Sequence, residues 1–64
     1  MQIKAEQHWP SEKSILYKID YLHKIGYAKI WIPKKIHTFD EKTGILTVED
    51  WFYNKEILPK IESL

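Results

Sequence analysis

The 64-residue chain contains neither cysteine nor arginine, and its uninterrupted apolar runs reach only three or four residues. Without cysteine there is no disulfide framework, no thiolate nucleophile and no zinc site of the cysteine type. A membrane-spanning helix needs about 20 apolar residues in succession. We therefore expect no membrane span and no signal-peptide core, and we expect a cytosolic location.

The missing arginine limits how the chain could bind DNA. Arginine supplies the bidentate donor fork that fits guanine edges and phosphates, whereas lysine is a point charge. The formal net charge is only +1, and all ten basic residues are lysines. These features argue against a strongly acidic DNA mimic, a histone-like basic binder and a sequence-specific reader of the major groove.

What the chain does contain is typical of a small globular domain. Hydrophobic residues make up 44% and charged residues 30% of the sequence, which is enough for one domain spanning residues 1–64. Charge is unevenly distributed: residues 1–36 hold seven lysines and three acids, and residues 37–64 hold three lysines and six acids. The two halves either complement each other within the fold or form a basic surface for an anionic partner.

The N-terminal part of the chain predicts a strand followed by a helix. Apolar and polar residues alternate over residues 1–6, which indicates a short strand, and residues 7–10 then serve as a connector. Ser11 is suited to cap a helix over residues 12–25, and Gly26 is suited to end it with a positive φ. The helical stripe would consist of Ile15, Ile19 and Leu22, with Leu16 and Ile25 at its edges.

From Ala28 onward the pattern changes to a period of two, typical of a strand. Pro33 cannot donate a hydrogen bond to a neighbouring strand, so we expect an edge strand or two strands with a bend at residues 33–35. Asp40 and Gly44 mark a hairpin turn, after which residues 45–49 return as a strand. One face would carry Ala28, Ile30, Ile32 and Ile36, and the other Lys29, Trp31, Lys35, His37 and Phe39.

A second helix is predicted near Asp50, capped by Thr47 or Asp50. Phe52 would point away from its apolar face, and Pro59 would end or kink the helix. That face would consist of Trp51, Tyr53, Ile57, Leu58, Ile61 and Leu64. The fold class is therefore predicted as α+β, a small antiparallel sheet with two helices packed on one face in the order β-α-β(β)-β-α.

This order of elements is superficially similar to that of double-stranded-RNA-binding modules and of small mRNA-cleaving toxins. The residues that carry those functions are missing at matching positions, so no residue roles transfer to this chain.

No catalytic or metal-binding constellation stands out. His8, His23 and His37 lie on three different predicted elements without the spacing of metal ligands, so we expect no metal and no cofactor. His37 with Lys35 and Asp40 could supply the groups of a metal-independent ribonuclease, but such trios arise by chance in a lysine-rich sheet. We expect a protein that is not an enzyme.

Aromatic residues are the stronger functional signal, because nine aromatics, three of them tryptophans, exceed what one small core needs. One candidate surface is the strand face with Lys29, Trp31, Lys35, His37 and Phe39. A second, with Tyr17 and Tyr21 between Lys13 and Lys24, would lie on the first helix. Alternatively, Trp9 and the N-terminal segment cover Trp31 and form a second small core.

Exposed aromatics between lysines fit two kinds of partner. Tryptophan and tyrosine anchor protein interfaces, and they also stack on the bases of single-stranded nucleic acid. The sequence favours a non-enzymatic interaction module, a regulator or inhibitor that binds a bacterial protein and is encoded by a phage or mobile element. The alternative is a single-stranded nucleic-acid or RNA binder that uses the sheet face. The oligomeric state is left open.

Overall fold

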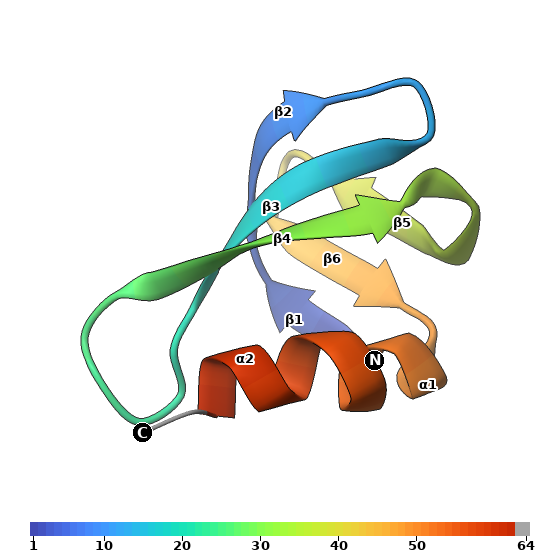
Figure 1. Cartoon of the computed structure of the whole chain (residues 1–64). Helices are drawn as coiled ribbons and strands as arrows, with labels where there is room; N and C mark the ends of the chain where they lie inside the picture. The colour runs from blue at the N-terminus through green and yellow to red at the C-terminus, as the bar shows by residue number, and fades with distance from the viewer. Residues whose placement is uncertain (63–64) are drawn as a thin grey trace.

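The computed structural model describes residues 1–62, which form six strands and one C-terminal helical segment (Figure 1). The strands are β1 (Gln2–Lys4), β2 (Glu6–Pro10), β3 (Ser14–Asp20), β4 (Tyr27–Pro33), β5 (His37–Asp40) and β6 (Ile45–Val48). They form two antiparallel three-stranded sheets with the orders β1-β6-β5 and β2-β3-β4. The α+β class is confirmed, whereas the prediction of two helices on one face of a single sheet is wrong.

The first ten residues join the two sheets. β1 pairs with β6, and β2, after Ala5, pairs with β3 in the other sheet (Figure 1). The Ala5 amide donates to the carbonyl of Gly44 at 3.0 Å, which ties this junction to the β5–β6 turn. The predicted strand over residues 1–6 is confirmed in part, and the prediction that residues 7–10 form a connector is wrong.

The predicted helix over residues 12–25 is also wrong, because this segment forms β3 and the loop that leads to β4. Ile15 and Ile19 are four residues apart. This spacing is close to one turn of a helix and is also two periods of a strand, so it fits either element. In the structure Tyr17 lies between them on the same inward face, fully buried. Because β3 pairs with both β2 and β4, this segment forms a strand and not a helix.

The residues predicted to cap that helix instead shape the turns at the two ends of β3. At one end, the Ser11 hydroxyl accepts a hydrogen bond from the Ser14 amide and donates one to the Ser14 carbonyl. At the other end, Gly26 has the positive φ that was expected, +125°, but it closes the β3–β4 loop. Its carbonyl accepts a hydrogen bond from the Tyr21 amide at 3.1 Å.

The predictions for the strand from Ala28 to Pro33, for the bend after it and for the turn between Asp40 and Gly44 are confirmed. β4 is an edge strand, and η1 (Lys34–Ile36), a single turn of 3₁₀-helix, makes the bend that follows Pro33. Ile30 and Ile32 point inward and Trp31 points outward, as the period of two predicted. At the β5–β6 turn, the Asp40 carboxylate accepts a hydrogen bond from the backbone amide two residues on, and Gly44 has a φ of +73°.

The helical segment comprises α1 (Asp50–Phe52), the π-helical turn η2 (Tyr53–Ile57) and α2 (Leu58–Glu62). Glu49 is its N-cap residue, and neither Thr47 nor Asp50 makes a side-chain capping bond there. Pro59 does not end the helix, because it is the second residue of α2, and the wider π-helical turn lies directly before α2.

The inward face of this helix differs from the prediction at two positions. Phe52 is buried and Trp51 is 58% exposed, the reverse of what was expected. In η2 the Leu58 amide donates to the carbonyl of Tyr53, five residues back, so residues five apart share a face. This turn places Phe52 on the same side as Ile57. Leu64 lies outside the described residues.

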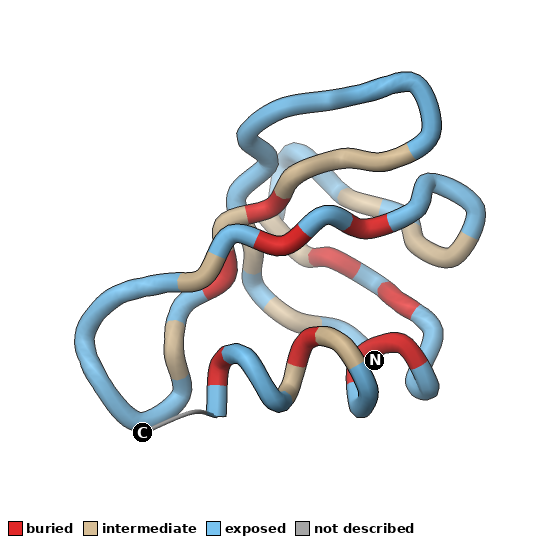
Figure 2. The backbone as a smooth tube through the Cα atoms, viewed as in Figure 1, coloured by how far each residue is buried: buried red, intermediate tan, exposed pale blue. Residues whose placement is uncertain are grey.

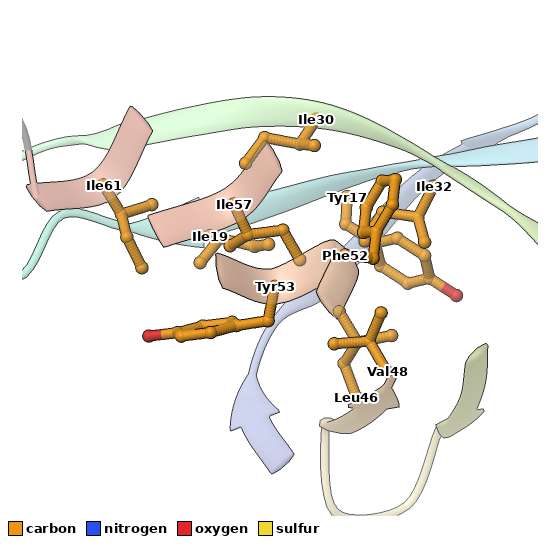
Figure 3. Close-up of a cluster of buried hydrophobic side chains, with 10 residues drawn as sticks. All are labelled: Tyr17, Ile19, Ile30, Ile32, Leu46, Val48, Phe52, Tyr53, Ile57 and Ile61. Atoms are coloured by element: carbon orange, nitrogen blue, oxygen red, sulfur yellow. The ribbon is translucent and has the colours of Figure 1, made fainter. Parts of the chain in front are cut away.

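One core unites both sheets and the helical segment (Figures 2 and 3). β3, β4, β6 and the helix all contribute buried side chains to it, and the helix lies beneath the strands in Figure 1. Among residues 1–62, the ten buried side chains are Tyr17, Ile19, Ile30, Ile32, Leu46, Val48, Phe52, Tyr53, Ile57 and Ile61. The element order that resembles double-stranded-RNA-binding modules and small toxins is therefore not found.

Candidate binding surface

The residues predicted to form one strand face are divided between two sheets. Lys29 and Trp31 are exposed on β4, and Lys35 is exposed in η1. His37 and Phe39 lie on β5 and are half-buried, and Phe39 packs against the core. The exposed position expected for Phe39 is therefore wrong, because the 3₁₀ turn after Pro33 interrupts the alternation and residues 37 and 39 then face inward.

The second predicted surface does not form either. Tyr17 is fully buried on β3, and Tyr21 is partly buried against the core. Lys24 lies over the Tyr21 ring, with its Nζ atom 4.6 Å from the ring centroid. Since this segment is not helical, Tyr17 lies on the inward face of β3, and Tyr21, directly after the end of β3, packs against the same core.

Tyr17 and His37 instead form a hydrogen-bonded chain. The Tyr17 hydroxyl lies 2.8 Å from Nε2 of His37, and Nδ1 of His37 lies 2.7 Å from the carbonyl oxygen of Pro33. A carbonyl oxygen only accepts, so in neutral His37 the proton is on Nδ1 and Nε2 accepts from the tyrosine hydroxyl. Burial raises the pKa of Tyr17 above its ordinary value. This chain connects β3, the end of β4 and the start of β5.

The ribonuclease-like trio of His37, Lys35 and Asp40 is not assembled by the contacts that the structure shows. Both ring nitrogens of His37 are engaged as described, and the Asp40 carboxylate accepts from the amide of Lys42. Within residues 1–62 there is also no group of three histidine or acidic side chains close enough to hold a metal ion.

The most prominent surface feature is a row of apolar side chains across the sheet β2-β3-β4. In the strand register Trp9 is paired with Leu16, and Leu16 is paired with Trp31. This row lies on the outward side of the sheet, because its neighbours Tyr17 and Ile30 point inward. Trp9 is 67% and Trp31 48% exposed, and Leu16 between them is half-buried. Trp9, Leu16 and Trp31 are called the tryptophan row below.

The other sheet shows what an ordinary solvent-facing row looks like in this protein. Across β1-β6-β5 the corresponding partners are Gln2, Thr47 and Thr38, all three exposed and polar. An antiparallel sheet with one solvated face normally has this polar composition on that face. The tryptophan row departs from it, since two large aromatic side chains are left in contact with water.

Lysines flank the tryptophan row along the strands. The next outward row pairs Glu6 with Lys18 and Lys18 with Lys29. Lys18 Nζ lies 3.7 Å from a carboxylate oxygen of Glu6 and 4.4 Å from the ring centroid of Tyr27. Beyond the other side of the row, the amide of Lys34 donates to the carbonyl of Lys13 at 2.9 Å, which places two more lysines at that end of the sheet.

The sequence predicted Trp31 and Lys29 on this surface but missed Trp9, Leu16 and Lys18. Trp9 was assigned to a connector, and Leu16 and Lys18 to a helix. A signal is nevertheless present in the sequence, because the polar residues Lys18 and Asp20 alternate with Tyr17 and Ile19. The protective covering of Trp31 by Trp9 is not seen, since both tryptophans remain exposed.

Within residues 1–62, no helix combines the length and apolar character required to cross a bilayer. Comparisons with protein-family models, with curated proteins and with solved structures found no match.

Proposed function

We propose that this protein is a non-catalytic binding module and that the tryptophan row is where it contacts a macromolecular partner. The proposal rests on one observation: Trp9 and Trp31 are exposed on either side of Leu16, on the outward face of the sheet β2-β3-β4. Tryptophan is the residue type most enriched among the few side chains that dominate binding energy at interfaces.

The tryptophan row contributes little that the fold itself needs. The buried core is built on the opposite side of the same strands, from residues such as Tyr17, Ile30 and Ile32. Exposed apolar area on a small protein favours aggregation unless a partner covers it. The presence of two exposed tryptophans on this face is therefore better explained by binding than by stability.

A comparison of three forms of the protein tests this proposal. The wild type, the double variant Trp9→Ala/Trp31→Ala and the control Trp51→Ala are immobilised and exposed to a lysate of the source cells. Trp51 is a matched control because it is similarly exposed, at 58%, but lies on the helix. We expect the wild type and Trp51→Ala to retain the same partner and the double variant to lose it, while the melting curves show that all three forms are folded at the temperature of the experiment. Equal retention by all three forms would exclude the tryptophan row as the binding site.

The narrower predictions from the sequence stay predictions. They are that the module is a regulator or inhibitor of a bacterial protein or, alternatively, a single-stranded nucleic-acid or RNA binder, that it acts in the cytosol and that a phage or mobile element encodes it. They rest on size, composition and the absence of a recognised catalytic group.

A further inference from the structure

We infer that the partner of the tryptophan row is single-stranded nucleic acid, with bases stacked on Trp9 and Trp31 and phosphates near the flanking lysines. This inference rests on the proposed function, because it names the class of molecule that the same surface would bind. Open sheets that display aromatic rings between cationic side chains are a recurrent way of binding unpaired bases.

The spacing of the two tryptophans favours unpaired bases. Trp9 and Trp31 lie on strands separated by β3, and adjacent strands are about 4.8 Å apart, so the two positions are about 10 Å apart. That distance is about three times the 3.4 Å rise between stacked nucleotides of one strand. A nucleic-acid strand that places one base on each tryptophan ring must therefore unstack its bases between the two rings. Single strands unstack readily, whereas a duplex resists it.

The distribution of charge favours an anionic chain on this sheet. Residues 6–36, which contain all of β2, β3 and β4, carry six lysines and three acidic residues, a net charge of +3. The remaining residues carry four lysines and six acidic residues, a net charge of −2. The basic end of the molecule is thus the sheet with the tryptophan row, and the acidic part contains the helix and the other sheet. This arrangement orients a polyanion toward the tryptophans.

The direct pairing of Lys18 with Lys29 also favours an anionic partner. Like charges directly opposite each other across two strands destabilise a sheet. Lys18 has Glu6 beside it, but within residues 1–62 Lys29 takes part in no ion pair. A phosphate over this pair would relieve the repulsion. The centre of a protein interface is normally depleted of charged residues, so these lysines next to the tryptophans fit a polyanion better than a protein.

Binding is measured by fluorescence anisotropy with labelled 12-nucleotide oligothymidylate and oligouridylate at low salt, and with a duplex of the same length. We expect the single strands to bind and the duplex to bind more weakly. Trp9→Ala and Trp31→Ala should each weaken binding about tenfold. Trp51→Ala, the matched control on the helix, should leave binding unchanged. In a Trp51→Phe variant Trp9 and Trp31 are the only tryptophans of the sequence, and a bound oligonucleotide should quench their fluorescence when tryptophan is excited selectively.

The lysine contribution is tested through salt dependence. For single strands, each phosphate contact contributes about 0.7 to the slope of log K against log salt concentration. Lys29→Gln should therefore lower that slope by about 0.7. Lys42→Gln, which changes an exposed lysine in the β5–β6 turn, should leave the slope unchanged. Both substitutions are at exposed positions, and circular dichroism checks that the variants are folded.

The outcomes separate this inference from the proposed function. Failure of the wild type to bind single strands at low salt, or equal loss of binding in Trp51→Ala, overturns the inference. If the lysate partner still depends on Trp9 and Trp31 in that case, the row binds a molecule of another class, such as an acidic protein, and the proposed function stands. If neither experiment depends on the two tryptophans, both are wrong.

Discussion

At the scale of single residues, Tyr17 shows how one buried polar group can organise a small fold. Its ring packs 5.2 Å from the rings of His37 and Phe39, measured between centroids, and its hydroxyl reaches His37. A buried hydroxyl without a partner is costly, so the hydrogen bond makes this position possible for tyrosine. Since His37 in turn donates to the carbonyl of Pro33, the contact also holds β5 against the end of β4.

Replacement of Tyr17 by phenylalanine tests this contact. The ring contacts remain, but Nε2 of His37 loses its hydrogen-bond donor, and we expect the free energy of unfolding to fall by about 1 kcal/mol at neutral pH. Urea denaturation measures it. Tyr27→Phe is the matched control. Tyr27 is 43% exposed, so removal of its hydroxyl should change the free energy of unfolding little. Equal effects of the two substitutions would show that the Tyr17 hydroxyl is not structurally important.

Tyr17 also predicts a pH dependence of stability. Burial raises its pKa in the folded protein above the ordinary value of 10.0. As the pH rises, the unfolded chain therefore loses this proton first, and ionisation favours the unfolded state. The contribution of Tyr17 is complete below pH 10 and decreases as the pH rises toward its pKa in the folded state. Above pH 10 the free energy of unfolding of Tyr17→Phe should fall less than that of the wild type. Urea denaturation at several pH values measures both, and an equal fall in the two proteins would contradict this prediction.

The two glycines should differ in their tolerance of alanine. A Cβ atom on Gly26 would lie 3.1 Å from the Tyr21 ring, and its φ of +125° is one that alanine rarely adopts. A Cβ atom on Gly44 would meet only the carbonyl oxygen of Ala5, at 3.6 Å, with a φ of +73°. We expect Gly26→Ala to cost more than about 1 kcal/mol and Gly44→Ala to cost less than Gly26→Ala. Melting temperatures compare them, and the reverse order would contradict the loop geometry.

At the scale of elements, the π-helical turn decides which side of the C-terminal helix is buried. Pro59 has no amide hydrogen, and in a regular α-helix its ring would crowd the carbonyl of Lys55. In η2 the bond from Leu58 to Tyr53 spans five residues instead of four, which widens the helix just before Pro59. The widened turn brings Phe52 onto the face of Ile57 and leaves Trp51 on the outside.

The relative stability of two alanine variants tests the position of this turn. Phe52→Ala removes a buried aromatic side chain and should lower the free energy of unfolding by about 3 kcal/mol or more. Trp51→Ala removes a larger but mostly exposed side chain and should cost less than about 1 kcal/mol. Chemical denaturation gives both values. A regular α-helix with Trp51 facing the core would produce the opposite order.

At the scale of the whole molecule, the chain folds compactly around a single core. Its radius of gyration, 10.9 Å, is close to the value of about 10.7 Å expected for a globular domain of this length. The loop after β3 is attached to the end of the helix, since the amide of Leu22 donates to the carbonyl of Ile61 at 3.0 Å. The helix carbonyls at this end would otherwise lack a partner. The sheets and the helix therefore depend on one another.

Truncation after Glu49 should consequently unfold the whole chain. Of the ten buried core side chains in the described part of the chain, it removes four, those of Phe52, Tyr53, Ile57 and Ile61. Burial of each such side chain contributes about 1.5–3 kcal/mol. The sum exceeds the 3–5 kcal/mol of net stability usual for a domain of this size. Circular dichroism and the dispersion of amide proton resonances measure the outcome, with the full chain as the control. A truncated chain with dispersed resonances would show that the sheets fold without the helix.

Features that depend on a few neighbouring residues could be predicted from the sequence alone. The β5–β6 turn is one, because the hydrogen bond from the Lys42 amide to the Asp40 carboxylate and the positive φ of Gly44 are both local. The inward and outward sides of β4 are another, because Ala28, Ile30 and Ile32 recur at every second position, the period of a strand. A helical C-terminal segment starting near Asp50 also follows from its pattern.

Features that depend on distant pairing required the tertiary structure. Ile15 and Ile19 fit a helix or a strand equally well, and only the pairing of β3 with two other strands decides between them. The tryptophan row exists only in that pairing, since Trp9, Leu16 and Trp31 are brought together by the register of three strands. Local periodicity specifies which side of a strand a residue occupies, but it does not specify which strands lie next to each other. That choice is made by burial of one core common to both sheets and the helix.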